Sequence, residues 1–228
     1  MKRKDTAQPM NRVNHDRLMY EQISDRHGQE FPRLLLHACC APCSSACLER
    51  LWQYFDITVF YYNPNIDNEP EYRKRLAEEK RLIDEFNKRI EAGDFLPIVT
   101  DDTLPSPHRI EIIDGDHDID LFHSTVHGLE NAPEGGERCM VCFALRLDEA
   151  AKTAASRGFD FFTTTLTLSP LKNADMLNDI GAAAGEKYGV CWLHSDFKKR
   201  DGYKRSIELS REYDLYRQNY CGCSFSKE

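Results

Sequence analysis

Cysteines are the residues of this 228-residue chain with the clearest potential for chemistry. The chain has nine cysteines, and eight of them are clustered in three short motifs. The stretch "HACCAPCSSAC" at 37–47 holds four, "CMVC" at 139–142 holds two, and "CGC" at 221–223 holds two. Thiolates are nucleophiles, redox groups and ligands for soft metals. We therefore expect a metal or redox site assembled from distant parts of the chain.

The spacing of the cysteines leaves the kind of site open. A C-x-x-C pair at a helix start can turn two sulfurs toward one centre, and two such pairs would make a four-cysteine zinc site. The adjacent Cys39 and Cys40 are expected to be awkward for one small tetrahedral ion and better suited to a polynuclear centre or to two neighbouring metals. With Cys47 and Cys191 interpreted as packing residues, seven cysteines remain, more than a zinc ion or a 4Fe-4S cluster binds.

The surplus thiols predict a second function beside the first site. Cys221 and Cys223 could form a redox dithiol that closes to a disulfide. Alternatively, these two and Cys43 could hold an extra metal that acts as a Lewis acid. The sequence pattern does not choose between these alternatives.

Composition favours a globular protein of the cytoplasm, with 41% hydrophobic and 30% charged residues. No apolar run approaches the roughly 20 residues that span a bilayer, so no membrane partner is expected. A reducing compartment makes a disulfide framework unexpected. The net charge of -8 argues against indiscriminate binding of nucleic acid. A local basic stretch, "DFKKRDGYKR" at 196–205, is compatible with a solvated helix start.

The elements that must position the cysteines alternate between strands and helices. Apolar and β-branched runs predict strands at 33–38, 57–66, 95–100, 159–168 and 190–197. Helices are expected from a cap at Ser44 or Ser45 through Trp52, and at 69–91, 140–154, 174–188 and 204–213. This alternation predicts an α/β fold with a parallel sheet and helices on both faces. Ligands bind outside the carboxyl ends of such strands, where "HACCAPC" falls.

The domain organisation is expected to be simple. Residues 1–30 are interpreted as a polar tail with at most one short helix, and 31–228 as a single α/β catalytic domain. Residues 101–138 interrupt the alternation with prolines and acidic clusters, so they are interpreted as an insertion. No glycine-rich phosphate loop is present, so nucleotide binding has no motif support.

Five longer stretches resemble one known family. They are "LLLHACCAPCSSACLERL", "YYNPNI" followed by "EYRKRLAEEKRL", "EGGERCMVCFALRL", "FTTTLTLSPLKN" and "DFKKRDGYKRSIELSREYDLYRQNYCGC". In this order, from residue 33 to residue 223, they resemble the QueH type of epoxyqueuosine reductase. The resemblance is specific, because three separate cysteine motifs and the "YRQNYCGC" ending coincide.

The resemblance implies an oxidoreductase that reduces the epoxide of epoxyqueuosine at the tRNA wobble position, the last step of queuosine biosynthesis. It implies a 4Fe-4S cluster, with an adjacent mononuclear iron as a further possibility, and an electron donor whose identity the sequence does not give. The implied fold is similar to the adenine-nucleotide α-hydrolase (HUP/PP-loop-like) group.

The same resemblance implies roles for individual residues. Cys39, Cys40, Cys139 and Cys142 match the cluster-binding set, and Cys43 matches a further metal ligand. The CGC pair matches the redox dithiol or the ligands of a second metal. Candidates for the general acid are Asp196, Tyr203 and His194. Expected phosphate contacts to tRNA are Lys198, Lys199, Arg200, Lys204 and Arg205, and expected stacking residues are Tyr216, Tyr220 and Phe225.

Two other functions compete with the reductase. An iron-sulfur-dependent tRNA sulfur transferase would use a related fold, but sulfur transfer in that group generally activates the base with ATP, and the loop for it is absent. A zinc-stabilised RNA-binding module without catalysis is the alternative from a different class.

Overall fold

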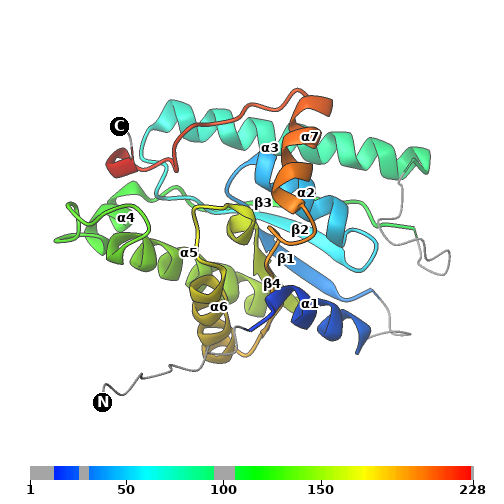
Figure 1. Cartoon of the computed structure of the whole chain (residues 1–228), viewed down its shortest axis with the longest axis horizontal. Coiled ribbons are helices and arrows are strands. Elements are labelled where there is room, and N and C mark those ends of the chain that lie inside the picture. The colour runs from blue at the N-terminus through cyan, green and yellow to red at the C-terminus, as the bar shows by residue number, and fades with distance from the viewer. Residues whose placement is uncertain (1–12, 26–30, 95–105, 227–228) are drawn as a thin grey trace, which may run out of the picture.

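A parallel five-stranded sheet forms the centre of the computed structural model, which describes residues 13–25, 31–94 and 106–226. The sheet order is β3-β2-β1-β4-β5, and every neighbouring pair is parallel. The strands are β1 (Arg33–His37), β2 (Asp56–Tyr61), β3 (Glu111–Asp114), β4 (Phe161–Thr164) and β5 (Cys191–Trp192). The predicted α/β fold with a parallel sheet is confirmed (Figure 1).

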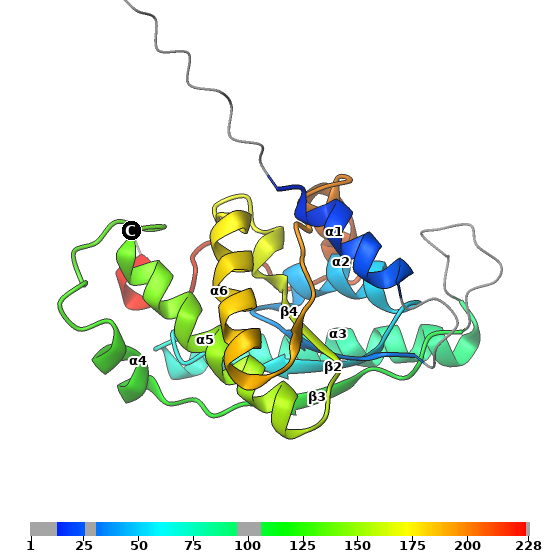
Figure 2. The same ribbon diagram turned by 90° about the horizontal axis from the view of Figure 1, so that it is seen from below.

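Helices cover both faces of this sheet, as expected. They are α1 (His15–Ser24), α2 (Ala41–Leu51), α3 (Glu69–Ala92), α4 (Ile119–Thr125), α5 (Glu137–Ser156), α6 (Ala174–Tyr188) and α7 (Gly202–Glu212), with short 3-10 turns η1 (Thr165–Leu168) and η2 (Ser224–Ser226). The alternation of side chains along β1 divides them between two layers. Leu34 and Leu36 join the core with α2, α3 and α7, whereas Leu35 joins the core with α5 and α6. Figure 2 shows α5 and α6 side by side.

The start of α2 differs from the prediction. The helix begins at Ala41, with Cys40 at the capping position and Pro42 in the first turn. Proline is tolerated there because first-turn N–H groups have no partner within the helix. Ser44 and Ser45 therefore lie inside the helix and cap nothing. Their hydroxyls donate to the carbonyls of Cys40 and Pro42, at 3.2 and 3.0 Å.

The last strand is also shorter than expected, because a side chain replaces the strand ladder. Asn178 of α6 accepts a hydrogen bond from Ser195 N at 3.0 Å and donates to Ser195 O at 2.8 Å. Its side-chain oxygen also accepts from Trp192 Nε1 at 2.9 Å. The chain leaves the sheet here and passes toward α7.

Segments near the predicted tail and insertion take part in the fold. Helix α1 lies within 1–30, where one short helix was allowed, and Met19 is buried in the core. Asp16 forms ion pairs with Arg50 and Arg200. Residues 101–138 contain β3, which pairs with β2, and α4. The strand predicted at 95–100 falls outside the described residues. None of the helices in the described ranges is both long and apolar enough to span a membrane.

Helix α6 packs so closely on β5 that one of its positions has no room for a side chain. A Cβ at Gly181 would overlap the ring of Trp192. Gly181→Ala should therefore lower the free energy of unfolding by about 1–3 kcal/mol, although alanine is the better helix former. Thermal unfolding measures this, with the exposed Glu186→Ala on the same helix as the control, expected within about 0.5 kcal/mol of wild type. A rise in melting temperature for Gly181→Ala would contradict the packing.

Candidate functional site

The first cysteine motif occupies the connection between β1 and α2, at the carboxyl end of the central strand. The neighbouring strand β4 ends beside it, and the two are joined by His37, whose Nδ1 accepts from the Thr164 hydroxyl at 2.8 Å. Its Nε2 donates to Tyr62 O at 3.1 Å. Burial, together with the charge of Arg146, lowers the pKa of His37 to about 3. This histidine is therefore a neutral structural residue beneath the cysteines.

Three sulfurs of the motif converge. The Sγ atoms of Cys39, Cys40 and Cys43 all lie within 4.8 Å of one another, and those of Cys39 and Cys40 are 3.7 Å apart. A tetrahedral ion with metal–sulfur bonds of about 2.3 Å holds its sulfurs about 3.8 Å apart. The expectation that adjacent cysteines are awkward for one ion is therefore wrong, because the bend at Cys39 turns both side chains the same way. The group can hold a metal ion.

The electrostatics of the group favour one thiolate. Thiol hydrogen bonds from Cys40 and Cys43 hold the pKa of Cys39 well below its ordinary value, and the positive charges of Arg146 and Lys172 act in the same direction against burial. The partners shift the other way: the pKa of Cys40 rises to about 12 and that of Cys43 rises well above its usual range, mainly because both donate to Cys39. Such a partly ionised set suits a positively charged ligand.

A pocket of about 980 Å³ opens over these sulfurs. Its walls bring together Cys39 and Cys43 from the first motif and Cys221 from the last. The pocket is also cationic, because its charged lining residues are Arg75, Arg146, Lys172, Arg217 and the single acid Glu134. None of these basic residues is among those predicted from the sequence. A signal was present for Arg146, which lies four residues after Cys142 and therefore one helical turn along the same face.

Arg146 connects the first two cysteine motifs. It is 1% exposed, and its Nη2 donates to Asn63 Oδ1. Its charge acts on the thiols of both Cys39 and Cys142. A buried guanidinium between two groups of thiols offsets the cost of a buried thiolate.

The second motif lies in the first turns of α5. Cys139 accepts a hydrogen bond from Gly135 N at 3.2 Å, and burial raises the pKa of Cys142 to about 12. Cys142 packs with Cys223 and Phe122. Among the described residues, only the first motif supplies three ligands within 4.8 Å of one another, so Cys139, Cys142, Cys221 and Cys223 lie outside that group.

The third motif is held by its backbone. Arg75 is 2% exposed, pairs with Glu71 at 2.7 Å and donates to Cys221 O at 3.0 Å. Gly222 has φ of +126°, and a Cβ there would lie 2.8 Å from Ile66, so this position needs glycine. The segment lies beside α4 in Figure 1. All nine cysteines are within the described residues and are free thiols.

The remaining predicted residues are spread over the surface around the pocket. Asp196 does not line it and pairs with Lys198 at 3.0 Å, whereas Tyr203 does line it. His194 contacts His15 at 3.2 Å. Lys199 and Lys204 are exposed, Arg200 pairs with Asp16, and Arg205 binds both carboxylate oxygens of Glu49. Of the aromatics, Tyr220 and Phe225 line the pocket, while Tyr216 donates to Glu71.

The two cysteines interpreted as packing residues behave differently. Cys47 is fully buried in the core, and burial raises its pKa well above the ordinary value. Cys191 is exposed, so the prediction that it packs inside is wrong. The reason is its place on β5, which is an edge strand of the sheet.

A buried acid lies behind the thiol pocket. Glu79 of α3 is fully buried, and its carboxylate has the Ser44 hydroxyl as a polar neighbour but makes no hydrogen bond of ordinary geometry to the described residues. Burial raises its pKa to about 8. The side chain is therefore largely protonated at neutral pH, and nothing in its sequence context, a charged helix, distinguishes it from its neighbours.

The fold and site define a parallel α/β protein whose central strand ends in a cysteine group able to hold metal. A family model for epoxyqueuosine reductase QueH matches residues 34–228. Three proteins called epoxyqueuosine reductase QueH are similar to the chain. The protein of Streptococcus pyogenes is 40% identical, and the match covers 96% of this chain and 80% of the relative. The protein of Staphylococcus epidermidis is 38% identical over 94% of this chain and 85% of the relative. The protein of Thermotoga maritima is 33% identical over 85% of this chain and 89% of the relative. The chain belongs to the epoxyqueuosine reductase QueH family of oxidoreductases.

The thiolate at Cys39 predicts a reactivity pattern in the reduced, metal-free protein. Iodoacetamide should modify Cys39 at a lower pH than it modifies an ordinary cysteine, while Cys47 stays unmodified, because thiolates react and buried thiols do not. Arg146→Met should move the pH profile of Cys39 upward, and the exposed Arg157→Met should not. Peptide mass spectrometry measures the modification, and equal profiles for the two arginine variants would contradict the electrostatic origin.

The raised pKa of Glu79 predicts how stability depends on pH. The unfolded chain releases this proton near its ordinary pKa of about 4.3. The folded chain releases it near 8, so the folded state binds more protons between these values and the free energy of unfolding falls as pH rises through the window. The melting temperature of Glu79→Gln minus that of wild type should therefore increase as the pH is raised from 5 to 8, because only the wild type has a buried carboxyl group to ionise. The exposed Glu186→Gln is the control, and a constant difference for Glu79→Gln would refute the shift.

Proposed function

We propose that this chain reduces the epoxide of epoxyqueuosine at the wobble position of tRNA, giving queuosine. The observation that carries the proposal is the pocket in which Cys39, Cys43 and Cys221 meet under a cationic wall. Membership of the reductase family supports the same reaction. Two electrons and two protons convert the epoxide to an alkene and one water, so the pocket must deliver electrons to carbon and accept oxygen as a leaving group.

The proposed cofactors are a 4Fe-4S cluster held by Cys39, Cys40, Cys139 and Cys142, and an adjacent mononuclear iron for which Cys43 is a ligand. The donor set is compatible with both, since it combines a thiolate with several thiols beside Arg146. A cluster of this type supplies electrons one at a time. The chain's own residues bind it, exclude bulk water and neutralise its charge.

Cys221 and Cys223 are proposed as the redox dithiol or as ligands of the second metal. Cys221 faces the pocket and Cys223 packs behind it against Cys142. A dithiol beside the metal site that closes to a disulfide releases two electrons and two protons, which is the number that reduction of the epoxide requires.

The proposed partners are tRNA carrying epoxyqueuosine and an electron donor of unassigned identity. Lys199, Arg200 and Lys204 lie exposed in or just before the first turn of α7, and we propose that they contact phosphates together with Arg205. Leu171 is 75% exposed and Tyr203 40% exposed, and both line the pocket, which suits an unstacked base. We propose that residues 31–228 act as one catalytic domain in the cytoplasm, with 101–138 as its insertion.

A second candidate is a zinc-stabilised RNA-binding module. The observation that favours it is the close three-sulfur group, whose spacing also fits a single zinc ion. This module would need no electrons and would turn nothing over.

Activity of the reconstituted protein separates these candidates. Supplied with a reductant and epoxyqueuosine-containing tRNA under anaerobic conditions, the protein should yield queuosine on digestion of the tRNA, detected by mass spectrometry. Iron analysis and visible absorption confirm that the metal site is loaded. A loaded, iron-containing protein that forms no queuosine would overturn the reductase, and a colourless protein with one zinc would favour the module.

Cys221→Ser tests the role of the third motif. The variant should keep most of the visible absorption of the loaded protein and lose at least 100-fold in turnover, because the hydroxyl can neither transfer electrons nor bind iron as a thiolate does. Cys191→Ser, at an exposed thiol of β5, is the matched control and should keep its turnover. Loss of the colour with Cys221→Ser would place this residue among the cluster ligands instead.

A further inference from the structure

The connection between β4 and α6 forms one wall of the thiol pocket. After η1 the chain turns outward, and Ser169, Pro170, Leu171 and Lys172 all line the pocket. Neither the cysteine motifs nor the basic stretch at 196–205 includes this loop. It places a lysine opposite three thiols from two different motifs.

Lys172 differs from the other cations of the pocket because its charged group makes no hydrogen bond to the described residues, whereas each arginine donates at least one. Arg75 pairs with Glu71, Arg146 donates to Asn63, and Arg217 donates to Ser210 Oγ at 2.8 Å. Within the described part of the chain, the ammonium of Lys172 makes no ion pair or hydrogen bond. Burial opposes the charge of this ammonium, and the thiolate of Cys39 raises its pKa. A charged donor without a protein partner is thus available to a ligand in the pocket.

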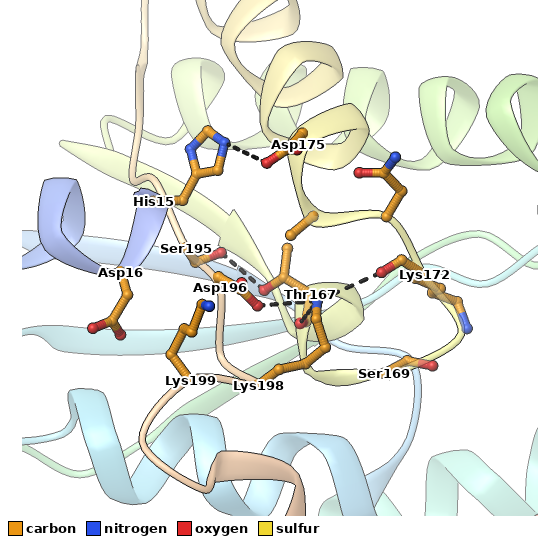
Figure 3. A network of polar contacts seen from close by, with 12 residues as sticks. His15, Asp16, Thr167, Ser169, Lys172, Asp175, Ser195, Asp196, Lys198 and Lys199 are labelled. Carbon is orange, nitrogen blue, oxygen red and sulfur yellow. Dashed lines mark hydrogen bonds and ion pairs between the residues drawn. The ribbon is translucent and has the colours of Figure 1, made fainter. Parts of the chain in front are cut away.

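A second lysine holds the loop that carries Lys172. The ammonium of Lys198 donates to Thr167 O at 2.9 Å and contacts Lys172 O at 3.5 Å, while Asp196 pairs with it at 3.0 Å. The hydroxyls of Thr167 and Ser195 lie 3.0 Å apart and tie the loop to the same segment. Figure 3 shows Lys198 reaching the backbone of the loop, while the nitrogen of Lys172 points away from this network. The contacts fix the main chain of Lys172 and leave its ammonium free.

We propose that Lys172 is a catalytic residue that binds the leaving oxygen of the substrate, and that Lys198 is the positioning residue that holds it there. The inference rests on the proposed reductase function. As both carbon–oxygen bonds of the epoxide break, two electrons from the reduced site form the alkene bond, and the oxygen accumulates negative charge. The ammonium donates a hydrogen bond to this oxygen, which takes two protons from water and leaves as water.

Asp196 and Lys198 then have roles different from those expected from the sequence. The carboxylate of Asp196 is engaged by Lys198 and lies outside the pocket lining, and Lys198 is engaged by two carbonyls. The Asp196–Lys198 ion pair and the contacts of Lys198 with the two carbonyls connect the end of β5 to the loop, and we call this set of contacts the latch. Asp196 is then not a general acid, and Lys198 is not a phosphate contact. Removing the latch should act on catalysis only through Lys172.

A double-mutant cycle tests this coupling with a modified anticodon stem-loop as substrate. Lys172→Met should lower kcat about 100-fold with little change in KM, as loss of one preorganised donor does. Lys198→Met should lower kcat about 10-fold, Lys198→Arg should restore part of this, and the double variant should be no slower than Lys172→Met alone. Lys152→Met, at an exposed lysine of α5, is the matched control and should keep kcat. Additive losses, or an unchanged kcat for Lys172→Met, would overturn the inference.

Two readouts are independent of turnover. In the metal-free protein, Lys172→Met and Lys198→Met should both move the alkylation profile of Cys39 to higher pH, whereas Lys152→Met should not. The slope of RNA binding against salt should stay unchanged for Lys198→Met; a slope smaller by about one would identify a phosphate contact and refute the latch. A wild-type protein without reductase activity would sink the proposed function, yet a Cys39 profile unmoved by Lys198→Met would still sink the latch separately.

Discussion

A buried thiolate is stable only where positive charge and hydrogen-bond donors surround it, and the site of this protein is built around that constraint. The pKa of Cys39 lies well below its ordinary value because two neighbouring thiols donate hydrogen bonds to it and because Arg146 and Lys172 lie near it. Each of these groups comes from a different part of the chain. The sulfurs follow β1, the guanidinium comes from α5 and the ammonium from the loop after β4, so the thiolate depends on all three being packed together.

The strand order explains how these parts can meet. From the central β1 the chain builds outward to β2 and β3, then crosses back to place β4 on the other side of β1. The connections after β1 and β4 therefore leave the sheet in opposite directions and open a crevice between them, the usual ligand position in such folds. The cysteine motif fills one side of this crevice and the loop of Lys172 the other.

Local patterns in the sequence were enough for most of the fold. The helix expected at 174–188 is α6, and the one expected at 69–91 is α3 to within one residue. The start of α2 was misjudged because serine, a common cap, also bonds to carbonyls within a first turn. The length of β5 depends on Asn178, a contact across the fold that periodicity does not reveal.

The site was predictable only as far as its cysteines. Their clustering indicated a metal or redox function, but the convergence of Cys39 and Cys40 depends on a backbone bend that spacing does not encode. Arg146 and Glu79 are ordinary charged residues of helices when only the sequence is considered. Their importance comes from burial, which is a property of the packed chain.

The contacts of the third cysteine motif fix its backbone and leave the side chain of Cys221 free to rotate. Arg75 donates hydrogen bonds to the main-chain oxygens of Tyr220 and Cys221, and Gly222 adopts the positive φ that the turn requires. These contacts hold the Cα of Cys221 in place. Nothing in these contacts binds the sulfur itself. Rotation about the Cα–Cβ bond of Cys221 turns its sulfur either toward the pocket or toward Cys223. Electron transfer between the pocket and the dithiol then requires rotation about one bond and no movement of the backbone.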